Sequence, residues 1–199
     1  SLHDTPVLIY NTGKPNPGKW HGSPPNFNIL HPTIQQEVLD WVKELCLIGK
    51  DHPSFKGIEL VITLHSMLSL GNLTTGYNDY MIAGFEHDTG IKVPVDRRAP
   101  LRGKLYAEWL LKNVKEKWID WRCKKLGEFY CRVADLIASE KTNLKLRINT
   151  ELSLPERNNP STWSNPDIVV KNNREAGIDP KYFKDRKNIV LTLTTQPAI

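Results

Sequence analysis

The sequence lacks the features that mark several large protein classes. No apolar run approaches the ~20 residues of a membrane-spanning helix, so no membrane partner is expected. No CxxC pair and no cluster of cysteine with histidine occurs, which argues against a structural zinc site, and we expect neither a metal nor a cofactor. The three cysteines, Cys46, Cys123 and Cys131, are expected to be buried free thiols, because the last two would lie about 12 Å apart along a helix, too far to pair with each other.

Nucleotide and nucleic-acid signatures are also missing. Neither GxGxxG nor GxxxxGK[ST] follows a predicted strand, and there is no G-x-S-x-G elbow for a serine hydrolase. The net charge of +5 is small, and its densest cluster, "DWRCKKLGEFYCR", lies on a predicted helix interleaved with acids. A solvated helix face explains that cluster, so no nucleic-acid partner is expected.

What is present is an ordinary globular composition. The 199 residues, 39% hydrophobic and 25% charged, fit a single domain spanning residues 1–199. The start "SLHDTPVLIY" has neither an initiator Met nor a signal peptide, and we interpret the sequence as an internal fragment of a larger protein. The location of that parent protein stays open, with secretion or the cell envelope as candidates.

Strand-like and helix-like segments alternate along the chain. Four short segments rich in Val, Ile, Leu and Thr predict strands at 6–11, 57–64, 143–150 and 188–195. Helical spacing predicts helices at 31–49, 78–90, 102–140 (broken near 113–117) and 165–177. Alternation of this kind predicts an α/β fold with parallel strands, either an open doubly wound sheet or a partial (β/α)8 TIM barrel. Long loops after the strands and short ones before them predict a functional face at the carboxyl ends of the strands.

Several stretches resemble one family. The run "FNILHPTIQQEVLDWVKELCLIGKDHPSFKGIELVIT" is similar to a segment of large bacterial glycoside-hydrolase-like TIM-barrel proteins, as are "YNDYMIAGFEHDTGIKVP", "WIDWRCKKLGEFYCRVADLI" and "REAGIDPKYFKDRKNIVLTL". The resemblance implies the middle of a barrel whose partner is the remainder of the parent barrel chain. It also implies a carbohydrate ligand at the carboxyl ends of the strands. One departure is that "HSML" stands where the largest barrel clan carries an Asn-Glu pair.

Glu151 is the candidate catalytic residue, because it follows the tip of a predicted strand. Glycoside hydrolysis uses two carboxyl groups, and no convincing second one is found. The other reading of Glu151 is an exposed loop residue. Asp79 is a weaker candidate that fits either a substrate loop or the first turn of a helix. Glu86 is interpreted as part of a solvated helix face.

The remaining candidates are polar and aromatic residues near strand ends. Exposed Trp20 and Trp163 would stack on a sugar, although both could instead cover the core. His65 would hold a sugar hydroxyl or serve as a hydrogen-bonded loop residue. The candidate substrate-binding residues are Asn11, Trp20, His21, His65, Asp79, Asn149 and Trp163.

Other conspicuous side chains are assigned to the core or to helix surfaces. Helical spacing predicts that Trp41, Trp109, Trp118 and Trp121 are core residues. Arg122 is expected to pair with a helix neighbour, Glu128 or Asp120.

Three functional hypotheses remain. The first is a glycoside hydrolase, and the second is a non-catalytic carbohydrate-binding or structural barrel, which the missing Asn-Glu pair favours. The third is a self-contained four-stranded open α/β domain.

Overall fold

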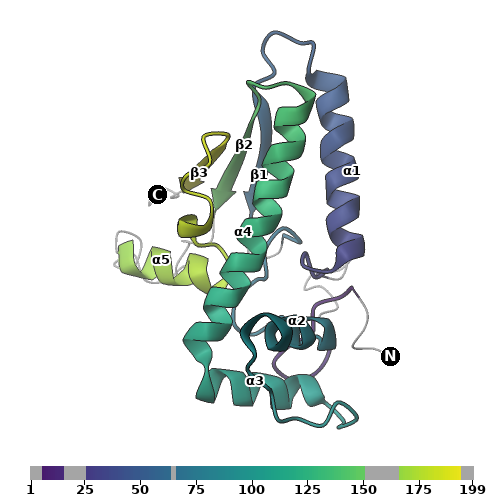
Figure 1. The fold of residues 1–199 in the computed structure, drawn as a ribbon, viewed down its shortest axis with the longest axis vertical. Coiled ribbons are helices and arrows are strands. Elements are labelled where there is room, and N and C mark those ends of the chain that lie inside the picture. The colour runs from purple at the N-terminus through teal and green to yellow at the C-terminus, as the bar shows by residue number, and fades with distance from the viewer. Residues whose placement is uncertain (1–5, 16–25, 64–65, 151–165, 194–199) are drawn as a thin grey trace, which may run out of the picture.

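The computed structural model describes residues 6–15, 26–63, 66–150 and 166–193 as a mixed α/β structure (Figure 1). In chain order its elements are α1 (Pro32–Gly49), β1 (Gly57–Ile62), α2 (Asp79–Thr89), α3 (Arg102–Asn113), α4 (Lys115–Glu140), β2 (Lys145–Thr150), α5 (Pro166–Glu175), the short 3-10 helix η3 (Pro180–Tyr182) and β3 (Ile189–Leu193).

Within these ranges the sheet has three strands in the order β1-β2-β3, and both neighbouring pairs are parallel. The strands end nearly level with one another: Thr150 of β2 lies opposite Ile62 of β1 and Leu193 of β3. The predicted strands at 57–64, 143–150 and 188–195, and their parallel arrangement, are therefore confirmed. Three strands show only part of an α/β fold, and no closed barrel is present among the described residues.

Residues 6–11 do not join this sheet, and the prediction of a first strand there is wrong. The segment instead makes isolated antiparallel bridges, such as the one between Tyr10 and Thr75. The Asn78 amide satisfies its backbone, since Nδ2 donates to the Val7 carbonyl (2.6 Å) and Oδ1 accepts from the Ile9 N–H (3.2 Å). These backbone groups are thus paired without a neighbouring strand.

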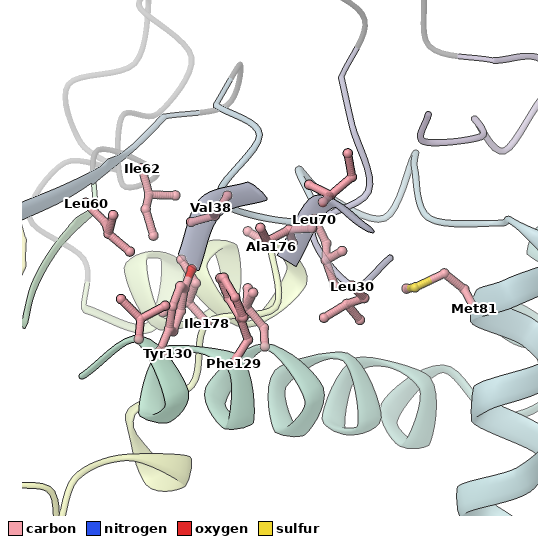
Figure 2. Close-up of a cluster of buried hydrophobic side chains, with 14 of the residues drawn as sticks. Leu30, Val38, Leu60, Ile62, Leu70, Met81, Phe129, Tyr130, Ala176 and Ile178 are labelled. Carbon is pink, nitrogen blue, oxygen red and sulfur yellow. The ribbon is translucent and has the colours of Figure 1, made fainter. Parts of the chain in front are cut away.

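Helices α1 and α4 cover one face of the sheet (Figure 1). Because side chains alternate along a strand, one set of strand residues packs under these helices and the other faces away. The inward set includes Leu60 and Ile148, and Figure 2 shows Phe129 and Tyr130 of α4 entering the same cluster. The outward set includes four residues that are exposed on β1 and β2: Glu59, Val61, Lys145 and Arg147.

The predicted break in the long helical span is confirmed at Val114. This residue leaves helical geometry (φ −144°, ψ 32°) and separates α3 from α4. Trp118 and Trp121 of α4 are buried, as expected, and stack with ring centroids 5.2 Å apart. Trp109 is partly buried against the core.

Trp41 is not a core residue, which corrects the sequence interpretation. It is 51% exposed on α1, together with Leu45 and Ile48. The side of α1 that packs inward carries Ile34, Val38, Val42 and Cys46. Both sets recur at helical spacing, so the pattern identifies the helix without identifying its buried side.

All three cysteines are free, and Cys46 and Cys123 are buried while Cys131 is partly buried. Burial raises the pKa of the Cys123 thiol to about 12. The prediction of free thiols is confirmed, with Cys131 less deeply placed than expected.

Candidate functional site

The carboxyl edge of the sheet is where the sequence predicts function, and part of it is described. Asn149, next to the end of β2, lies opposite Val61 and Thr192 on the face turned away from α1 and α4. The following residue, Thr150, is fully buried, and its Oγ1 has no hydrogen-bond partner in the part of the chain that the structure describes. Five predicted site residues lie outside the described residues, and their assignments stay predictions: Trp20, His21, His65, Glu151 and Trp163.

Asn11 is not at the end of a sheet strand. Its N–H donates to the Thr74 carbonyl (2.7 Å), which joins the 6–15 segment to the loop after β1. The structure thus brings Asn11 to that loop, whereas Asn149 is carried by β2.

Asp79 lies in the first turn of α2 and is held by two residues of α3. Its carboxylate accepts from Arg102 Nε at 2.9 and 3.0 Å and from the Tyr106 hydroxyl at 3.1 Å. The Asp79 and Arg102 side chains are each 14% exposed. Burial, and next the Asp79 charge, raise the pKa of Tyr106 to about 12. The carboxylate is therefore engaged in an ion pair that joins α2 to α3.

The loop from Ser66 to Asn78, which follows β1, is held by two buried side chains of α4. The Arg122 side chain is 0% exposed, and its Nη2 donates to the carbonyls of Leu70 (3.0 Å) and Asn72 (3.1 Å). The Tyr130 hydroxyl donates to the Leu68 carbonyl at 2.8 Å. Backbone carbonyls satisfied in this way give the loop a defined shape at the carboxyl edge of the sheet.

The predicted pairing of Arg122 with Glu128 or Asp120 is wrong. Glu128 pairs with Lys125 and Asp120 with Lys181, while Arg122 points into the interior. No carboxylate contacts the guanidinium among the described residues, and its Nε and Nη1 have no hydrogen-bond partner. Burial lowers the pKa of Arg122.

Glu86 is also not a solvated helix residue. Its Oε1 accepts from the Val93 N–H (2.8 Å), and its Oε2 binds Arg97 Nη2 (2.9 Å). The carboxylate therefore fixes the segment that follows α2.

A groove between α2, α4 and the start of α1 was not found from the sequence. It has a volume of about 470 Å³ and is floored by Leu30, Trp121 and Phe129. Asp88 Oδ2 accepts from Trp121 Nε1 at 2.9 Å, and Lys125 Nζ lies 3.3 Å from the same oxygen. Hydrogen bonds from His87 and Trp121 hold the pKa of Asp88 at about 2. A carboxylate with such a pKa stays ionised and does not act as a general acid.

Helical spacing in the sequence groups the residues that line this groove on one side of each helix. Tyr80, Gly84 and Asp88 recur every four residues on one side of α2, and Trp121, Lys125, Glu128 and Arg132 recur on one side of α4. Nothing in the sequence indicates that these two sides face each other.

Comparisons with known protein families, with curated proteins and with solved structures found no match. Within the described ranges, no group of three or more His, Cys, Asp or Glu side chains could hold a metal ion. The same part of the chain contains no helix that is both long and apolar enough to cross a membrane.

Proposed function

We propose that this chain is part of a glycoside-hydrolase-like (β/α)8 barrel that binds carbohydrate at the carboxyl edge of β1-β2-β3. The strand order carries the proposal. In a barrel, consecutive strands are neighbours and the helices form one outer layer; a doubly wound sheet has this arrangement only within each half, and its order reverses between the halves. The order β1-β2-β3, with α1 and α4 on the same face, matches the barrel pattern.

Two exposed surfaces support an incomplete barrel. The exposed side of α1 carries the apolar residues Trp41, Leu45 and Ile48, where a neighbouring outer helix of a barrel would pack. The face of the sheet that is turned away from α1 and α4, on which Val61 is exposed, would line the interior of the barrel. The remainder of the parent barrel chain would cover both surfaces.

The carbohydrate ligand is supported by the family resemblance and by the polar residues at the strand ends. Asn149 is an amide on the outward face of β2, next to the carboxyl edge. An amide donates and accepts hydrogen bonds at once, as sugar hydroxyls require. The loop after β1 is fixed by Arg122 and Tyr130, so ligand binding would not have to order it.

A non-catalytic carbohydrate-binding or structural module is the second candidate. The ion pair of Asp79 with Arg102 favours it, because it engages a carboxylate that could have assisted Glu151. Hydrolysis requires a second carboxyl group.

The test is a panel of neutral and acidic oligosaccharides, assayed for binding by calorimetry and for turnover by release of reducing ends. We expect Asn149→Ala to weaken binding at least tenfold, and Glu151→Gln to abolish turnover while binding persists. Exposed Glu108→Gln on α3 is the matched control. Binding without turnover in the unaltered protein would select the second candidate, and unchanged binding by Asn149→Ala would contradict a ligand at this edge.

The incomplete barrel has its own test. Exposed parallel edges promote association, so the 199-residue chain should self-associate in analytical ultracentrifugation. A monomer with a cooperative melt at high temperature would contradict it.

A further inference from the structure

The geometry points to a second ligand site, in the groove between α2 and α4, that takes a neutral oligosaccharide. The site lies among helices rather than at the carboxyl edge, and it does not depend on the function proposed there. Its volume of about 470 Å³ lies within the range of ~300–1,000 Å³ typical of ligand pockets.

The groove combines an apolar floor with an exposed aromatic rim. Leu30, Trp121 and Phe129 form the floor and are buried. Gly84 keeps the floor open: a Cβ there would lie 3.0 Å from Trp121 Cζ2. At the rim, the Tyr80 side chain is 43% exposed, and its ring centroid lies 5.6 Å from that of His31. An exposed tyrosine ring offers the apolar platform on which the C–H face of a pyranose stacks.

The polar walls carry balanced charges. Lys125 Nζ lies 3.3 Å from Asp88 Oδ2 and 3.0 Å from Glu128 Oε2, so one cation bridges two carboxylates. Further along, Arg132 Nη1 donates to Gln35 Oε1 at 2.7 Å. Two cations and two carboxylates thus line one groove together with the Gln35 amide and with His87, whose Nδ1 lies 3.0 Å from Asp88 Oδ1.

This balance selects the class of ligand. A phosphate or carboxylate ligand would meet Asp88 and Glu128, and a cationic ligand would meet Lys125 and Arg132, so neither sign gains net attraction. A neutral polyol has no such conflict, because each hydroxyl both donates and accepts hydrogen bonds. Asp88, whose pKa is held at about 2, stays ionised in this groove and accepts hydrogen bonds rather than donating a proton.

The experiment is a titration of the protein with neutral oligosaccharides of three to six units, followed by 15N-resolved NMR. We expect shifts at Tyr80, Gly84 and Lys125, with dissociation constants that hardly depend on salt. Tyr80→Ala should weaken this binding at least tenfold, as should Ala83→Trp, which fills the groove from an exposed position of α2.

Matched controls separate groove binding from general effects. Trp41→Ala removes an exposed aromatic from α1, and Lys104→Met breaks an exposed ion pair on α3; neither should alter the dissociation constant. Melting curves establish whether Tyr80→Ala and Ala83→Trp remain folded. If either variant unfolds, the 15N shifts of groove residues in the unaltered protein, measured during the oligosaccharide titration, decide.

Three results would overturn the proposal: no shifts in the groove with any neutral oligosaccharide, equal affinity in Tyr80→Ala, or tighter salt-sensitive binding of an acidic oligosaccharide. The two sites fail separately. If Asn149→Ala loses oligosaccharide binding and Tyr80→Ala keeps it, only the site at the carboxyl edge is supported. The opposite result supports only the site in the groove.

Discussion

Replacing Asp79 by Ala tests whether this residue holds the fold together or serves a ligand. The change removes the carboxylate that accepts from Arg102 and Tyr106, and it leaves the Arg102 guanidinium, only 14% exposed, without this anion. Asp79→Ala also removes a negative charge from the first turn of α2, where the helix dipole favours it.

The expected loss of stability is large for a single substitution. Removing one partner of a buried ion pair costs about 3–5 kcal/mol, because the other charge stays buried. The dipole contribution adds about 0.3–1 kcal/mol. In a domain of this size each kcal/mol lowers the Tm by roughly 2–4 °C, so the two contributions together predict a fall of about 7–24 °C.

Thermal and urea unfolding of four proteins measures this: the unaltered chain, Asp79→Ala, Arg102→Leu and the double variant. The double variant should be less destabilised than the sum of the two single changes, because the uncompensated charge is gone. A Tm within about 1 °C of the unaltered chain in Asp79→Ala, accompanied by lost oligosaccharide binding, would refute the structural role and restore Asp79 as a binding residue.

Three further outcomes are expected. Stability should fall as the pH rises from about 10 to about 12, because the pKa of Tyr106 is raised to about 12 and the protonated form that the fold favours is lost in that window; a flat urea midpoint there would contradict this. Gly57→Ala should lower the Tm far more than Gly90→Ala: a Cβ at Gly57 would lie 1.9 Å from a backbone oxygen, whereas nothing lies within 4 Å at Gly90, and both have positive φ. In a thiol-reagent assay of the native protein, Cys123 should not react and Cys131 should react first, with all three cysteines reacting in denaturant.

The sequence predicts the elements of this fold better than their faces and partners. Strand composition located β1, β2 and β3, and the helical span from Arg102 to Glu140 was divided at the right place. These are local properties, which short stretches of sequence encode. Which side of α1 is buried is not local, since Trp41 and Val38 both lie on apolar stripes at helical spacing.

The wrong assignments share one physical cause, which is contact between residues far apart in sequence. Residues 6–11 have strand composition, yet Asn78 supplies the hydrogen bonds that a neighbouring strand would have given. Arg122 has acidic neighbours on its own helix, yet it binds carbonyls about 50 positions away. In the candidate site, the sequence placed Asn149 near a strand end but gave no sign of the groove, which requires knowing that α2 faces α4.

The placement of Arg122 makes the loop after β1 dependent on a helix that is synthesised later. The Leu70 carbonyl of that loop accepts from the Thr75 hydroxyl within the loop (2.7 Å), and the donor from Arg122 to Leu70 and Asn72 is added only once α4 has docked. Loop and helix therefore form one cooperative unit, whose amide hydrogens should exchange together. Shortening the donor, as in Arg122→Lys, would consequently reshape the carboxyl edge from within the core, with every residue at that edge left unaltered.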